Sequence, residues 1–207
     1  MPSDAFQRFQ SSMVIDYEKW HDGVGYDIEA LDELSPAERI KVEHMLAPRA
    51  EKDWRDLEAL DRLGTPGALQ AIWRARESSD ADIRMHALQY GPTPTPAEWD
   101  KAIVYSLRQV KPFAGLVITM ESAIEHPSPR VVAALWQHVK VPGSEITFHA
   151  AQALLCIAGK LDGQYDDAQR PLQLRLQGPA SADRDLALTE LAVLCNGSAA
   201  SGANTVE

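Results

Sequence analysis

One short segment near the N-terminus of this 207-residue sequence gathers the side chains best suited to recognition or proton transfer. Residues 15–27 combine three aromatic residues, four acids, one histidine and two glycines. Aromatic side chains beside charges are over-represented where proteins bind other proteins. The sequence therefore predicts a partner-binding site in this segment, formed by Asp16, Glu18, Trp20, His21, Asp22, Tyr26 and Asp27.

The residues do not predict a catalytic centre. His21 and Asp22 could share a proton, but adjacent side chains on a helix point apart. No two of the six histidines have the i, i+4 spacing of a helical zinc site. His149 falls on an apolar stripe, so we expect it in the core together with Leu154 and Cys156. Nucleophile elbows, phosphate-binding loops and dinucleotide fingerprints are absent from the sequence, so we expect no catalytic residue, no metal and no cofactor.

A recurring Ser/Thr-Pro dipeptide indicates the helices that must position this segment. Its prolines are spaced by 30, 30 and 33 residues, a period typical of stacked helical repeats. The hydroxyl can accept a hydrogen bond from the first helical turn, and proline removes an N–H that would have no partner there. We therefore predict helix starts at Ser35-Pro36, Thr65-Pro66, Thr95-Pro96 and Ser128-Pro129, with capping boxes completed by Glu38 and Glu98.

Apolar residues recur at helical spacing along most of the remaining sequence. Phe6, Phe9, Met13 and Tyr17 predict a first helix, and Phe113 opens another stripe at helical spacing. Residues 172–177 alternate apolar and polar as a strand would, but their context favours a helix. A last helix is expected over about residues 182–195. The sequence thus predicts an all-α fold of about nine or ten helices in antiparallel pairs.

The stretch from Leu57 to Leu69, followed by residues 80–84, resembles a HEAT-like repeat, most of all the short form of phycobilisome-lyase-type HEAT repeats. That family's pattern is A-L-x-x-L-G-D-P-x-A, then D-x-x-V-R at the start of the next helix. Here Thr65 replaces the aspartate, and Ile83-Arg84 stands for Val-Arg. The resemblance is good over about residues 50–90 and implies antiparallel helix pairs stacked into a curved array. It implies no lyase activity, because such repeats serve many unrelated functions.

Repeat and resemblance together predict three parts of the chain. We expect a HEAT-like α-solenoid over residues 35–196, an atypical N-terminal helical cap over residues 1–34 and a disordered tail over residues 197–207. A solenoid must cover the apolar end of its stack. Under this interpretation Tyr17, Trp20 and Tyr26 form the core of the cap and the neighbouring acids are solvated. A cap can also bind a partner, so the two interpretations are compatible.

The charge balance narrows the class of partner. The chain carries 20 basic and 30 acidic residues, a net charge of −10. Residues 1–64 hold 15 of the acids and 8 of the basic residues, a net of −7. This acidity argues against nucleic-acid binding, which requires a basic face, and favours a basic protein partner.

Other features of the sequence indicate where in the cell the protein resides. The N-terminus lacks the apolar core of a secretory signal, and no apolar run is long enough to span a membrane. Cys156 and Cys195 are too far apart in the sequence for a disulfide framework or a zinc motif, and each lies in an apolar run. We therefore expect a cytoplasmic protein that does not bind membranes.

These observations predict a non-catalytic protein-binding module. Its size, acidity and expected architecture resemble those of bacterial immunity proteins, which bind and neutralise a cognate toxin. The alternative is an enzyme or chromophore-attachment partner of the HEAT-repeat lyase type, which would need a ligand pocket and a polar constellation. A third class, the HEAT-type alkylpurine glycosylases, requires a basic concave face that this composition disfavours.

Overall fold

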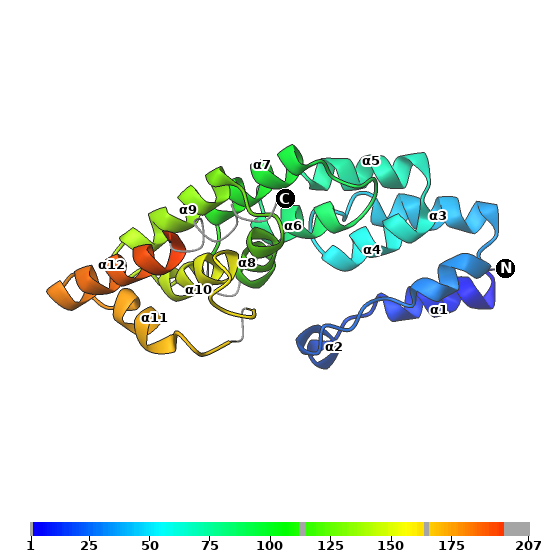
Figure 1. The fold of residues 1–207 in the computed structure, drawn as a ribbon. Coiled ribbons are helices and arrows are strands. Elements are labelled where there is room, and N and C mark those ends of the chain that lie inside the picture. The colour runs from blue at the N-terminus through cyan, green and yellow to red at the C-terminus, as the bar shows by residue number, and fades with distance from the viewer. Residues whose placement is uncertain (1, 112–114, 164–165, 197–207) are drawn as a thin grey trace, which may run out of the picture. The chain divides into compact units, whose positions relative to one another are not determined.

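A computed structural model describes residues 2–111, 115–163 and 166–196, which form twelve α-helices, one 3₁₀ helix and no strand (Figure 1). This confirms the predicted all-α class. The chain divides between Pro94 and Thr95 into two compact units. Unit 1 contains α1 (Asp4–Ser12), α2 (Tyr17–His21), η1 (Ile28–Glu33), α3 (Pro36–Leu46), α4 (Trp54–Leu63), α5 (Pro66–Ala75) and α6 (Ala81–Gln89). Unit 2 contains α7 (Pro96–Leu107), α8 (Leu116–Glu125), α9 (Pro129–Lys140), α10 (Thr147–Ile157), α11 (Arg170–Gln177) and α12 (Ala182–Asn196).

All four Ser/Thr-Pro dipeptides begin a helix, with proline in its first turn, as predicted. At three of them the hydroxyl accepts a hydrogen bond from the N–H three residues ahead, as for Ser128 and Val131 at 3.1 Å. At the fourth, the Glu38 carboxylate accepts from both the N–H and the hydroxyl of Ser35, at 3.1 and 2.7 Å. These contacts satisfy polar groups that the helix ends leave free, which explains why each helix starts there.

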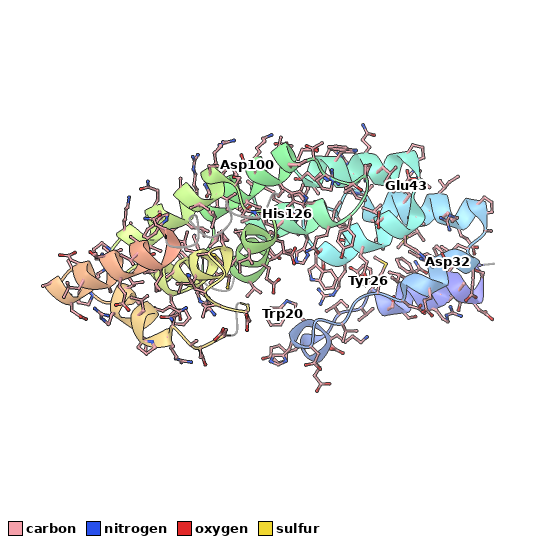
Figure 2. All side chains as sticks on the ribbon, viewed as in Figure 1. Trp20, Tyr26, Asp32, Glu43, Asp100 and His126 are labelled. Atoms are coloured by element: carbon pink, nitrogen blue, oxygen red, sulfur yellow. The ribbon has the colours of Figure 1, made fainter. Side chains whose placement is uncertain are left out.

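Two of these caps also reach the helix that lies two positions earlier in the chain. The Thr65 hydroxyl at the start of α5 donates to the Glu43 carboxylate of α3, and Ser128 at the start of α9 donates to Asp100 of α7. Asp100 and Glu43 are labelled in Figure 2. Within each unit, substantial helix contacts join elements that are adjacent in the chain or one element apart. The Ser/Thr-Pro period of the sequence thus corresponds to a contact that recurs between helices two positions apart in the chain, α3 with α5 and α7 with α9.

The ambiguous segment at residues 172–177 is helical, as the context favoured. In α11, Leu172 and Leu176 are buried while Leu174 is 53% exposed. The i, i+4 pair faces the core, and Leu174 lies on the other face of the helix. The first helix is shorter than the sequence predicted, because α1 ends at Ser12 and Tyr17 begins α2. The expected helix near the C-terminus is confirmed as α12.

The prediction for α10 is only half right. Leu154 is buried, as expected, but His149 is exposed. Burial lowers the pKa of His149 below its ordinary value, so its ring is partly shielded by neighbouring atoms even though the residue is exposed as a whole. The helix buries the face that carries Ala150, Ala151 and Leu154, and His149 lies outside that face. Cys156 and Cys195 are both partly buried free thiols. Phe113 and the predicted tail at 197–207 lie outside the described residues.

Candidate functional site

The segment that the sequence singled out is attached to unit 1 through its C-terminal half. Arg55 of α4 is buried and donates its Nε–H to the Val24 carbonyl at 2.7 Å. The Asp27 N–H donates to the Ser12 hydroxyl at 2.9 Å, which ties the segment to the end of α1. The Tyr26 ring packs edge-on against Phe9, with ring centroids 6.0 Å apart. Residues 24–27 therefore form a fixed base.

Tyr26 is a core residue of unit 1. Its side chain is 6% exposed, and its hydroxyl donates to Oδ1 of the fully buried Asp56 at 3.0 Å. Figure 2 shows Tyr26 at the base of the segment, beside α1 and α4. A buried ring cannot reach a partner in the folded protein, so we leave Tyr26 out of the binding surface. The cap interpretation, which placed Tyr26 in the core, is correct for this one residue.

The buried Asp56 carboxylate is electrostatically unusual. Loss of hydration raises the pKa of Asp56, while the Arg49 guanidinium and the Tyr26 hydroxyl oppose the shift. Arg49 Nε lies 3.2 Å from Asp56 Oδ2 as an ion pair, but its N–H is not aligned to donate a hydrogen bond to that oxygen. Burial, followed by the negative charges of Asp56 and Asp53, raises the pKa of Tyr26 above its ordinary value. Tyr26 therefore stays protonated and remains a donor.

Beyond this base, the chain displays a short apolar and aromatic tip. No residue of α2 is buried, and Tyr17 and Trp20 are 74% and 63% exposed. Val14 and Val24, on either side of α2, are 67% and 44% exposed. The Tyr17 and Trp20 rings lie 6.1 Å apart. In Figure 1, α2 lies at the end of two chain segments that lead away from α1 and η1. The cap interpretation, which buried Tyr17 and Trp20, is wrong for both residues.

The four acids of the segment fall into two groups. Asp16 caps α2 by accepting from the Lys19 N–H at 2.9 Å, and Asp27 caps η1 by accepting from the Ala30 N–H at 3.2 Å. Asp27 also pairs with Arg8 at 3.4 Å. Glu18, in the first turn of α2, and Asp22, just after its last residue, are exposed, and neither side chain accepts the cap hydrogen bond of α2. These two carboxylates are therefore the most accessible to a partner.

His21 and Asp22 are closer than the sequence indicated. His21 Nδ1 lies 3.0 Å from Asp22 Oδ1, whereas adjacent side chains within a helix were expected to point apart. Asp22 follows the last residue of α2, where the backbone leaves helical geometry and the side chain can turn back. Both side chains are about two-thirds exposed to water, at 66% and 69%. Because both groups are this accessible, water competes for the proton that the pair could share.

Val14, Tyr17 and Val24 are the members of this surface that sequence reasoning missed. The two valines flank the aromatic and acidic residues on either side of α2, and the cap interpretation had placed Tyr17 in the core. We call Val14, Tyr17, Glu18, Trp20, His21, Asp22 and Val24 the α2 surface.

Over the part of the chain that the structure describes, no group of three or more histidine, cysteine, aspartate or glutamate side chains is arranged to hold a metal ion. No helix within those same ranges has both the length and the apolar character needed to cross a bilayer. Comparison of the chain with family models, with curated proteins and with solved structures returned no match.

Proposed function

We propose that this protein is a non-catalytic binding module, built as a HEAT-type helical array, that recognises a basic surface of a protein partner through its α2 surface. The observation that carries the proposal is the contrast between the two halves of one segment. Residues 24–27 are fixed to the core by Arg55, Tyr26 and Asp27, while the aromatic side chains of α2 remain in water.

The exposure of these aromatic residues supports a role in recognition. Single exposed apolar residues are normal on protein surfaces, but a contiguous cluster marks an interaction site. Here four such residues lie within eleven positions of the chain, from 14 to 24. Tyrosine and tryptophan supply much of the binding energy of protein interfaces. The segment contributes little to the core through α2, so recognition accounts for it better than stability does.

The charge of the surface supports a basic partner. Glu18 and Asp22 are exposed beside the aromatic residues, Asp22 next to the His21 ring, and residues 1–64 carry a net charge of −7. Opposite charge on a partner raises the rate of encounter, and an inhibitor of a harmful enzyme benefits from fast association. A toxin or effector domain with a basic face, neutralised in the cytoplasm by this protein, is the partner class that fits best.

The test begins with the identification of a partner by affinity capture from the native host, followed by measurements on the purified pair. We expect Glu18→Lys with Asp22→Lys to slow association by about tenfold or more and to reduce its dependence on salt. The matched control is Glu51→Lys with Asp162→Lys, which makes the same change in net charge at two exposed acids elsewhere.

Equal rates for the two double variants would show that only overall charge matters, which contradicts a specific α2 surface. Turnover of a small molecule by the purified protein alone, lost on changing a single histidine or carboxylate, would replace the binding module with an enzyme.

A further inference from the structure

A groove of about 550 Å³ lies between α7 and α9 of unit 2, and none of its lining residues belongs to the α2 surface. Its floor is apolar and shallow, formed by Val104, Leu107, Ala133 and Ala134. Two small alanines facing two larger aliphatic residues leave an open channel between the helices. The polar side chains along its edges are Arg108, Arg130, Gln137 and His138.

The cationic side chains stand at opposite ends of this groove. Asp100, near the start of α7, accepts hydrogen bonds from Ser128 and Arg130 at the start of α9, the latter at 2.6 Å. The two helices therefore begin side by side, which places Arg130 at one end. Arg108 directly follows the last residue of α7, and His138 lies eight residues beyond Arg130 on α9. At 1.5 Å per residue, the two ends are about 12 Å apart.

These edge groups are available to a ligand. The side chains of Arg108, Gln137 and His138 form no hydrogen bond or ion pair with any residue in the described ranges 2–111, 115–163 and 166–196. The Arg130 side chain is 69% exposed and uses only Nη1 to bind Asp100, which holds the guanidinium in place and offsets part of its charge. None of the described residues that line the groove carries a carboxylate. This is an unusual surface on a chain with a net charge of −10.

We propose that this groove binds an extended acidic segment of a protein, with two carboxylates four residues apart and an aliphatic side chain midway between them. In an extended chain, residues i, i+2 and i+4 point to the same side, and i to i+4 spans about 13 Å. That distance matches the separation of Arg130 from Arg108 and His138. The central side chain then rests on Ala133 and Ala134, and each end carboxylate pairs with a guanidinium.

The same geometry excludes a helical ligand with this four-residue spacing. A helix brings the i and i+4 side chains within about 6 Å of each other, too close to bridge the two ends. The chain's own segments with two carboxylates four residues apart and an aliphatic residue midway, residues 29–33 and 121–125, belong to η1 and α8, so a folded second copy does not present them in extended form. The groove therefore has a different ligand from the α2 surface, and the proposal does not depend on the function proposed above.

Fluorescence polarisation with the full chain tests this proposal. The probe is a fluorescein-labelled Gly-Ser-Glu-Ser-Leu-Ser-Glu-Ser-Gly peptide, and the comparison peptide has the same composition with its two glutamates adjacent. We expect the spaced peptide to bind at least about tenfold more tightly than the comparison peptide. Arg108→Glu and Arg130→Glu should each weaken its binding by about tenfold or more, while Arg170→Glu, a charge reversal at an exposed arginine of unit 2, should leave it unchanged.

A second variant keeps the test independent of charge and of the Asp100 pair. Ala133→Trp fills the floor of the groove from an exposed position and should abolish binding of the spaced peptide while circular dichroism stays unchanged. Equal binding of both peptides, or no binding of the spaced peptide at about 1 mM, would overturn the proposal. Tighter binding of a peptide comprising residues 13–27 of this chain would also overturn it, in favour of a second copy as the occupant.

Discussion

Replacing Tyr26 by phenylalanine removes one buried hydroxyl at the base of the α2 surface. The substitution keeps the ring that packs against Phe9 and removes the hydroxyl that donates to Asp56 at 3.0 Å and accepts a longer hydrogen bond from Arg49 Nη2 at 3.4 Å. No apolar contact is lost, so no cavity term arises. A hydrogen bond to a charged group contributes about 1.5–3 kcal/mol, and the buried Asp56 oxygen loses a donor that water cannot replace. We therefore expect Tyr26→Phe to lower the free energy of unfolding by about 1.5–3 kcal/mol at neutral pH.

The assay is urea denaturation followed by circular dichroism, with Tyr17→Phe as the matched control. Tyr17 is 74% exposed, so removal of its hydroxyl should change the free energy of unfolding by less than about 0.5 kcal/mol. The denaturant slope should be equal in both variants, because neither changes the surface exposed on unfolding. If the two variants have equal stability, Tyr26 does not fix the base of the segment, and our distinction between base and tip is wrong.

Three further predictions concern the helices. Leu154→Ala should lower the free energy of unfolding by about 2–5 kcal/mol in a denaturant melt, because burial is lost and a cavity forms. The control, Leu174→Ala at a 53% exposed position, should cost less than about 0.5 kcal/mol. Equal effects would mean that α10 or α11 is oriented differently. Thr65→Ala removes a cap and should cost about 1 kcal/mol in the same assay. Hydrogen bonds from the Ser35 hydroxyl and neighbouring N–H groups lower the pKa of Glu38 from 4.5 to about 2. The ionised carboxylate therefore stabilises the fold above pH 4.5, and this contribution is lost as the pH falls toward 2. The difference in unfolding free energy between wild type and Glu38→Gln should therefore shrink over that pH range, and a difference that is constant with pH would contradict this assignment.

The helix starts were predictable from the sequence because their causes are local. A Ser or Thr followed by Pro supplies a cap and a first-turn residue within two positions, and Glu38 completes its box three residues later. At each of these starts the deciding interactions lie within one turn of helix. The helix over residues 170–177 was different, because the local alternation has the period of a strand and only the context favoured the helix that forms there.

The roles of the aromatic residues in the N-terminal segment were not predictable, because their causes are distant in the sequence. Tyr26 is buried because Asp56, thirty residues later, accepts its hydroxyl, and Phe9 covers its ring. Trp20, six residues before Tyr26, has the same apolar character and is exposed. Periodicity cannot separate these two outcomes within one irregular segment.

The groove in unit 2 was invisible to sequence reasoning for a related reason. Arg108 and Arg130 belong to different helices, and only the register between α7 and α9, set by Asp100, places them at the two ends of one channel.

The most direct test of the central claim is a pair of measurements on Trp20→Ala. We claim that α2 serves recognition rather than stability, and Trp20 is its largest exposed side chain. With the purified partner, the dissociation constant should rise by about 30-fold or more, a loss of about 2 kcal/mol. The free energy of unfolding should change by less than about 0.5 kcal/mol. An unchanged dissociation constant, or a loss of stability as large as the loss of binding, would contradict the claim.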